Sequence, residues 1–195
     1  MKKQTHTIQR SQHKTVFRTL LWISIAAILV TFSNLSVTRA ESDLSEWGEI
    51  LSGSQYLSVS SNDTFSLFVN PQNGDFYVEN LADHQKWYAY PPERSSDSLA
   101  TGFNQSNMES ALIVSYINDK KVTNDTNSSI SSVAKQGLKT YRMENGVIFE
   151  YHFPDEAFTI PISCTLNEDG IEVSILTEQI KEQGELKIVE CVLYP

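Results

Sequence analysis

Apolar and polar residues alternate along most of the chain after residue 55. Residues 65–69 and 76–78 show the alternation, and the last third of the chain, from residue 138 onward, shows it most clearly. A period of two is typical of strands that bury one face and expose the other. The pattern predicts strands at residues 56–59, 65–69, 76–78, 86–90, 111–117, 138–143, 147–153, 158–166, 171–176 and 186–193.

Turn signals join several of these strands in pairs. Asn-Gly occurs at residues 73–74 and 145–146. This pair supplies the positive φ angles that tight hairpin turns require. Hairpins are therefore predicted over residues 64–80 and 138–153, and the Asn-Glu-Asp-Gly segment at 167–170 predicts a third.

The segments between the strands are mostly polar. Residues 41–55 have a weak helical pattern and indicate a linker or a short helix, whereas residues 93–110 and 118–132 are expected to be loops, the second of them mobile. A short helical turn capped by Thr177 is expected within residues 177–183. Close-spaced strands without a long amphipathic helix predict an all-β fold, an antiparallel β-sandwich.

The first forty residues differ in composition from the rest. They hold six Lys and Arg and no acidic residue, and residues 20–32 form an apolar run. That run would span about 20 Å as a helix, against about 30 Å of hydrocarbon. Residues 1–40 are therefore predicted to be a signal peptide cleaved between Ala40 and Glu41, with an uncleaved signal anchor or a buried core helix as alternatives.

This leader determines the expected location and domain layout. The exported part is expected to be secreted or at the cell surface, with membrane contact only through the leader. Residues 41–55 would link the leader to a β-sandwich at residues 56–195. About 155 residues after the leader suffice for one domain with its own core.

Charge excludes one class of partner. Of the 15 basic and 24 acidic residues, nine basic and all 24 acidic residues follow the leader, so residues 41–195 carry 9 − 24 = −15. Such a surface repels phosphate backbones, and nucleic-acid binding is not expected.

Several short motifs, taken in order, resemble a known group of proteins. The resemblance is to large secreted proteins of Gram-positive bacteria, of unknown function, in which an N-terminal sandwich similar to galactose-mutarotase-like domains precedes a glycosidase-like barrel. It covers roughly residues 55–195. The motifs are Phe65-Ser66-Leu67-Phe68-Val69-Asn70-Pro71, Lys86-Trp87-Tyr88, Pro91-Pro92, Ile160-Pro161-Ile162, Ile180-Lys181-Glu182 and Val192-Leu193-Tyr194-Pro195.

The resemblance implies a function without catalysis. In those proteins the last strand continues into the barrel, so the sandwich here is expected to be truncated at its C-terminal end. Its expected role is to support a glycosidase-like barrel or to bind glycans weakly, and glycans or such a barrel are the expected partners. Two alternatives stay open: a mutarotase-like sugar epimerase, and a structural or adhesive cell-surface domain.

Candidate catalytic residues are few. Glycoside cleavage needs two carboxyl groups facing each other across a substrate. The acids available, Asp83, Asp155-Glu156 and Glu168-Asp169, fall in predicted turns, where acids are common because they are solvated. His84 and His152 lie in no nucleophile motif, and His152 is expected to be a surface or cross-strand residue. No catalytic residue is therefore predicted.

Cofactor and metal signals are equally weak. No glycine-rich phosphate loop and no repeated Cys/His spacing occurs, so no cofactor is expected. Calcium is the cation that an acidic exported domain would attract, through Asn73, Asp75 and Glu79 or through Asn124 and Asp125. Neither set matches a calcium loop, and no metal site is predicted.

Aromatic residues offer the one binding signal. Trp87, Tyr88 and Tyr90 precede Pro91-Pro92, and flat rings stack on the apolar faces of sugars. They are the predicted weak carbohydrate-binding residues. The alternative that the sequence favours for Trp87 is packing in the core, because strand aromatics are usually packing residues.

The two cysteines are expected to be unpaired. Cys164 and Cys191 would lie in an oxidising compartment, where a bridge is common. If residues 158–166, 171–176 and 186–193 form a meander, however, the outer strands lie about 9.6 Å apart, beyond the reach of a disulfide. A disulfide between them is disfavoured, and a buried thiol is expected at Cys164.

Overall fold

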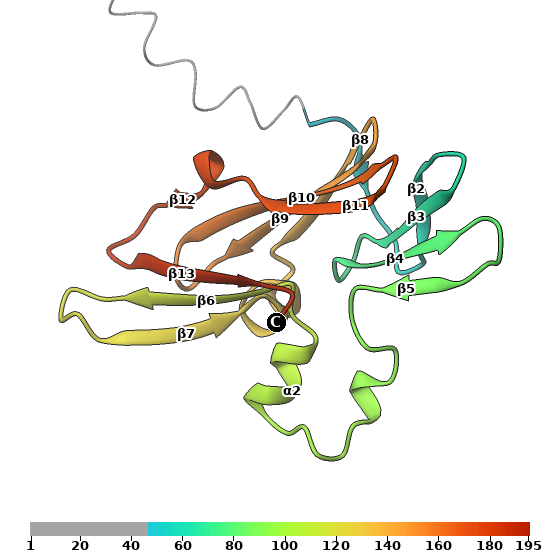
Figure 1. The fold of residues 1–195 in the computed structure, drawn as a ribbon. Helices are drawn as coiled ribbons and strands as arrows, with labels where there is room; N and C mark the ends of the chain where they lie inside the picture. The colour runs from blue at the N-terminus through green and yellow to red at the C-terminus, as the bar shows by residue number, and fades with distance from the viewer. Residues whose placement is uncertain (1–46) are drawn as a thin grey trace, which may run out of the picture. The chain divides into compact units, whose positions relative to one another are not determined.

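Antiparallel strands in three sheets build the domain in a computed structural model, which describes residues 47–195. The six-stranded sheet has the order β1-β8-β9-β10-β11, with β12 also paired to β10, and the smaller sheets have the orders β13-β6-β7 and β2-β3-β4-β5. Figure 1 shows the six-stranded sheet above the β13-β6-β7 sheet, with β2 to β5 beside them. The all-β antiparallel fold is thus confirmed.

The elements follow one another with short connections. The strands are β1 (Ile50–Leu51), β2 (Leu57–Ser61), β3 (Phe65–Asn70), β4 (Asp75–Asn80), β5 (Lys86–Tyr88), β6 (Leu112–Ile117), β7 (Thr123–Asn127), β8 (Leu138–Met143), β9 (Gly146–Phe153), β10 (Phe158–Asn167), β11 (Gly170–Ile175), β12 (Lys181–Glu182) and β13 (Lys187–Leu193). The helices are α2 (Phe103–Met108) and α3 (Ser128–Ser131), with single 3-10 turns η2 (Arg94–Ser96), η3 (Val133–Lys135) and η4 (Thr177–Gln179).

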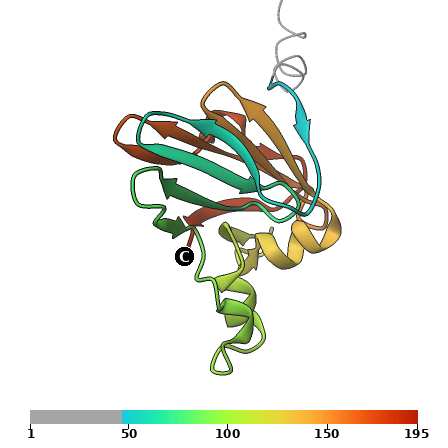
Figure 2. The ribbon, with the colours of Figure 1, turned by 90° about the vertical axis from the view of Figure 1, so that its right-hand side faces the viewer.

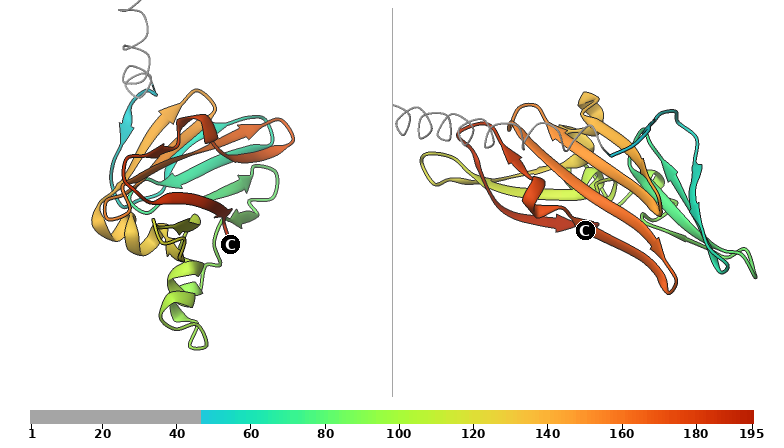
Figure 3. Two further views of the ribbon diagram at one scale, coloured as in Figure 1. Left: turned by 90° about the vertical axis from the view of Figure 1, so that its left-hand side faces the viewer. Right: turned by 90° about the horizontal axis from the view of Figure 1, so that it is seen from above.

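One apolar core joins the three sheets. It collects the inward-facing residues of β3, β4, β6, β9 and β10, with the alternation that the sequence shows. In Figures 2 and 3 the long strands β9 and β10 lie on one side of this core and the shorter sheets on the other. The fully buried large residues are Leu67, Val69, Leu112, Val114, Val147, Phe149, Tyr151, Phe153, Phe158, Ile160 and Ile162.

The three predicted hairpins are confirmed, but the two Asn-Gly turns differ. Gly74 has a φ of 74°, as its turn between β3 and β4 requires. Gly146 has no positive φ; it is instead the first residue of β9, where an added Cβ would overlap the carbonyl oxygen of Cys164. At Gly146 the glycine therefore permits a close approach of two strands.

The N-terminal boundary lies earlier than predicted. Residues 47–55 are not helical: β1 pairs with β8, Ile50 opposite Tyr141, and the ring of Trp47 meets that of Tyr141 edge-on at 5.6 Å. The domain therefore extends to Trp47, where the compact unit of residues 47–195 begins. The predicted signal peptide and its cleavage site at Ala40 and Glu41 lie outside the described residues.

Both predicted loops contain regular structure. Residues 93–110 include α2, and residues 118–132 include β7 and α3. The Asn127 side chain accepts a hydrogen bond from the Ile130 N–H at 3.0 Å and donates to Ser106 Oγ at 2.7 Å. Buried polar groups that are paired in this way stabilise a segment that has little apolar surface to bury.

Two predictions near the C-terminal end are wrong. The expected helical turn is present as η4, but Thr177 does not cap it, because η4 begins at Thr177 after Leu176 without a side-chain cap, and β12 begins at Lys181. The last strand does not continue a meander either: β13 pairs with β6, Leu193 opposite Leu112, and lies in a different sheet from β11. Periodicity identifies a strand but gives no information about its partner.

Candidate functional site

Four aromatic residues form a cluster on the outer surface of the β2 to β5 sheet. Tyr77 is at its centre, with its ring stacked on that of Phe68 at a centroid distance of 4.8 Å. The rings of Tyr88 and Tyr56 lie 5.2 Å and 5.0 Å from that of Tyr77. We call these four residues the aromatic face.

Strand register brings the aromatic face together. Phe68 is opposite Tyr77 across β3 and β4, and Tyr77 is opposite Tyr88 across β4 and β5. Because successive side chains alternate between the two faces of a sheet, Leu67 and Val78 point the other way, into the core. One side of this sheet therefore packs against the core, and the other side carries the aromatic face.

Exposure differs across the aromatic face. Tyr77 is buried by its neighbours, whereas Tyr88 is 41% exposed and Tyr56 is 38% exposed. The two outer rings thus offer apolar surface to a ligand while the central ring holds them in position. Flat apolar rings with polar edges are the groups that proteins use for amphipathic ligands.

Charged groups border the aromatic face on one side. The Glu79 carboxylate accepts a hydrogen bond from His84, with Nδ1 at 2.8 Å from Oε1, and Lys86 Nζ lies 3.9 Å from Glu79 Oε2. Lys86 Nζ also lies 4.8 Å from the centroid of the Tyr77 ring. These side chains place hydrogen-bonding groups next to the exposed ring of Tyr88.

A cleft of about 490 Å³ opens at the other end, and Tyr56 belongs to both regions. The Tyr56 hydroxyl donates to Asp75 Oδ2 at 2.7 Å, and Arg94 Nη2 donates to the same oxygen at 2.9 Å. Burial and the Asp75 carboxylate raise the pKa of Tyr56. We call this the Asp75 cleft; it is lined by Tyr56, Asn73, Asp75, Tyr90, Pro92, Arg94, Glu109, Ser129 and Val133.

Three tyrosines lie behind the Asp75 cleft. The hydroxyls of Tyr90, Tyr151 and Tyr194 are buried and have no hydrogen-bond partner within residues 47–195. The rings of Tyr90 and Tyr194 are 5.4 Å apart. Desolvation raises the pKa of all three hydroxyls well above the ordinary value. We call these residues the tyrosine cluster.

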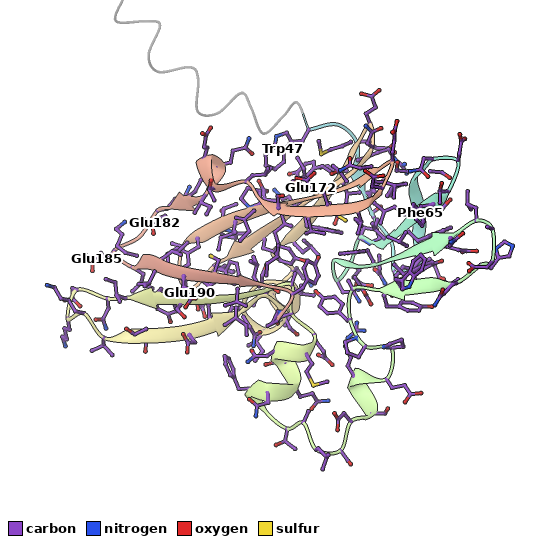
Figure 4. The ribbon with its side chains drawn as sticks, viewed as in Figure 1. Trp47, Phe65, Glu172, Glu182, Glu185 and Glu190 are labelled. Atoms are coloured by element: carbon purple, nitrogen blue, oxygen red, sulfur yellow. The ribbon has the colours of Figure 1, made fainter. Side chains whose placement is uncertain are left out.

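The structure does not bring Trp87, Tyr88 and Tyr90 onto one surface. Tyr88 belongs to the aromatic face, whereas Tyr90 is buried beneath the Asp75 cleft. Trp87 is on the opposite face of β5, where its ring meets that of Phe65 at 6.0 Å; Figure 4 labels Phe65. Trp87 is opposite Val78 and so faces the core side of the sheet, as expected, but it is 46% exposed and is not buried there. Its strand is at the sheet edge, where no further strand covers it.

The candidate acids and histidines are dispersed. Asp155 pairs with Lys135, and Asp83 accepts a hydrogen bond from the Gln85 N–H within its turn. Glu168 and Asp169 are exposed in the turn between β10 and β11, and Glu156 is buried in the turn before β10. His84 is paired with Glu79, whereas His152 is exposed opposite Thr159 on the neighbouring strand, the cross-strand position predicted.

The residues considered for calcium are engaged elsewhere. Asp75 binds Arg94 and Tyr56, and Glu79 binds His84. Asp125 accepts a hydrogen bond from Ser115, and Asn124 donates to the Val122 carbonyl. Within residues 47–195 no group of three or more His, Cys, Asp or Glu side chains is arranged to hold a metal ion.

The two cysteines are free and lie in different sheets. Cys164 is on β10, and Cys191 is on β13, which pairs with β6. Burial raises the pKa of the Cys164 thiol to about 12, and it also raises the pKa of half-buried Cys191. Both side chains are therefore thiols rather than thiolates at neutral pH, which makes them poor nucleophiles.

Sequence reasoning missed most of the site. Tyr56, Phe68 and Tyr77 occupy three different strands or loops, and Arg94 follows in a segment that was expected to be a loop. One signal was available in the sequence. Aromatic residues occupy both odd and even positions of the strands at residues 65–69 and 76–78, which indicates a sheet with aromatic side chains on its two faces.

Together the fold and the site define an all-β domain with an exposed aromatic face beside an acidic cleft. A scan against protein-family models finds no match for this chain, and a search of curated proteins finds none either. No helix within residues 47–195 has both the length and the apolar character needed to cross a membrane.

Proposed function

We propose that this protein is a secreted, non-catalytic β-sandwich domain that binds glycans through its aromatic face. The observation that carries the proposal is the pair of exposed rings, Tyr56 and Tyr88, held on either side of Tyr77. Sugars have apolar C–H faces and polar edges. A row of rings bordered by Glu79 and Lys86 complements both.

The proposal includes the finer features expected from the resemblance. The sandwich would be of the galactose-mutarotase-like type, and the leader would direct the domain out of the cell or to its surface. Asp83, Asp155 and Glu168 lie in three different turns, and Asp155 is already paired with Lys135, whereas glycoside cleavage needs two carboxyl groups across one substrate; this supports a role without catalysis.

A glycosidase-like barrel is the proposed protein partner. The exposed apolar side chains of Val189 and Val192 on β13, 60% and 39% exposed, offer a surface for it. Glu182, Glu185 and Glu190, labelled in Figure 4, lie around this strand. Replacing both valines by serine is expected to abolish association with such a barrel while glycan binding persists; unchanged association would contradict this part of the proposal.

Replacing Tyr88 by alanine tests glycan binding directly. Tyr88→Ala is expected to weaken binding about tenfold, because loss of one stacking ring is worth about 1.4 kcal/mol. The folded domain should persist, since Tyr88 is on an edge strand and is 41% exposed. A glycan array identifies the ligand, and titration calorimetry with the full chain measures the affinity.

The matched control is Trp87→Ala. Trp87 has similar exposure and belongs to the same strand, but it is on the opposite face. This variant is expected to bind glycans as the original chain does. Equal affinities for Tyr88→Ala and the original chain, or binding to no glycan at all, would contradict the proposal and favour a structural cell-surface domain.

A further inference from the structure

The Asp75 cleft is lined by charged side chains, unlike the aromatic face next to it. Its charged side chains are Asp75, Arg94 and Glu109, so two carboxylates face one guanidinium. Arg94 is already engaged by Asp75 Oδ2, by the Pro91 carbonyl and by the ring of Tyr90, 4.7 Å from the centroid. One negative charge in the cleft is therefore left uncompensated.

That charge belongs to Glu109, at the C-terminal end of α2. Glu109 is a partly exposed residue that lines the cleft, and its side chain makes no hydrogen bond or ion pair within residues 47–195. A carboxylate accepts hydrogen bonds and cannot donate them. A carboxylate that lines a cleft without a partner is available to a cationic ligand group, with which it would form a charge-assisted hydrogen bond.

The buried wall of the cleft also has unused polar atoms. Asp75 and Tyr90 are each only 4% exposed, and Asp75 Oδ1 and the Tyr90 hydroxyl have no partner within the described part of the chain. Buried polar atoms are normally paired, so these two atoms indicate a missing hydrogen-bond partner. Asp75 Oδ1 requires a donor, and Glu109 requires one as well.

We propose that the Asp75 cleft binds an amino sugar residue of the glycan, with the ammonium group at Glu109 and ring hydroxyls toward Asp75 and Tyr90. The inference rests on the proposed function, because Tyr56 makes the cleft continuous with the aromatic face. A volume of about 490 Å³ is within the range of small-ligand sites. The charge of 9 − 24 = −15 over residues 41–195 favours a cationic sugar over a uronic acid.

Calorimetry with the full chain and four short probes tests this assignment. The probes are trimers of glucosamine, N-acetylglucosamine, glucose and galacturonic acid, at mildly acidic pH, where amines are protonated. The glucosamine trimer is expected to bind about tenfold more tightly than the N-acetylated trimer, because only the former supplies a charge-assisted hydrogen bond. The galacturonate trimer is expected to bind most weakly.

Glu109→Gln is the decisive variant. Glu109 makes no side-chain contact that the fold depends on, so the variant is expected to fold and to bind all three uncharged or cationic trimers with similar affinity. Glu93→Gln is the matched control, since Glu93 lies near the cleft without lining it, and it should keep the preference for glucosamine.

Four results would overturn the inference, three with sugars and one with a peptide. The three with sugars are equal binding of the glucosamine and N-acetylglucosamine trimers, a preference that survives in Glu109→Gln, and tighter binding of galacturonate. A lysine tripeptide that binds as tightly as the glucosamine trimer would also overturn it, because the cleft would then be a site for peptide amines. If the glucose trimer still binds through Tyr88 in those cases, the proposed glycan-binding function stands without this specificity.

Discussion

Stability is expected to fall steeply when the pH rises above about 10, the ordinary pKa of tyrosine. The tyrosine cluster, Tyr90, Tyr151 and Tyr194, has raised pKa values in the folded domain. Above pH 10 the unfolded chain loses these three protons while the folded domain retains them, so unfolding releases protons. The contribution to stability is fully present below that pH and is lost as the pH rises toward the folded pKa values.

The expected loss is large. Each retained proton lowers the free energy of unfolding by about 1.4 kcal/mol per pH unit, and three together by about 4 kcal/mol per unit. A domain with a typical stability of about 5–15 kcal/mol would unfold within a few pH units. Circular dichroism and absorbance at alkaline pH measure the two events, which should occur together.

Tyr151→Phe provides the control. Its hydroxyl has no partner within residues 47–195, so the change should be nearly neutral at pH 7. The pH dependence of stability above pH 10 should then decrease by about 1.4 kcal/mol per pH unit, the contribution of the one retained proton that is removed. Ionisation of all eight tyrosines near pH 10 without any loss of tertiary structure would show that the cluster is not buried as described.

Gly146→Ala is expected to destabilise the domain by about 3 kcal/mol or more, since overpacking against fixed backbone is among the more costly substitutions. A Cβ at this position would overlap the carbonyl oxygen of Cys164, on the paired strand β10. The neighbouring atoms are backbone of a central strand pair and cannot move aside as a flexible side chain would. Urea unfolding measures the change.

Gly184→Ala is the matched comparison. A Cβ there would lie 3.4 Å from the Ala157 side chain, an ordinary contact. This variant is expected to stay within about 1 kcal/mol of the original stability. Equal effects of the two substitutions would contradict the close approach of β9 and β10 at Gly146.

The parts of the fold that sequence reasoning predicted are those with local signals. Alternation and turn residues are local, so the hairpins of β3 with β4, β8 with β9, and β10 with β11 were all expected. The partner of β13 is not a local property, because pairing with β6 depends on how the rest of the chain is folded. β7 was missed because its residues, Thr123–Asn127, are all polar and show no apolar alternation, although they pair with β6.

The site was less predictable than the fold. Tyr88 was identified from its neighbours in sequence, but its actual neighbours in space are Tyr77 and Tyr56. The ion pair of Asp75 with Arg94 joins β4 to the segment after β5, and neither residue carries a motif that indicates the other. A surface built from several strands becomes visible only when their register is known.

The long-range strand pairs have a consequence for how the domain reaches its structure. Ile50 pairs with Tyr141, and Leu112 pairs with Leu193, so each of these pairings closes a loop of most of the domain. The entropy of closing such loops must be lost before their contacts form, and folding times in the range of milliseconds to seconds are expected. The β13-β6-β7 sheet cannot be completed until Leu193 has been synthesised. During translation the domain therefore stays without its final tertiary structure until β13 has left the ribosome.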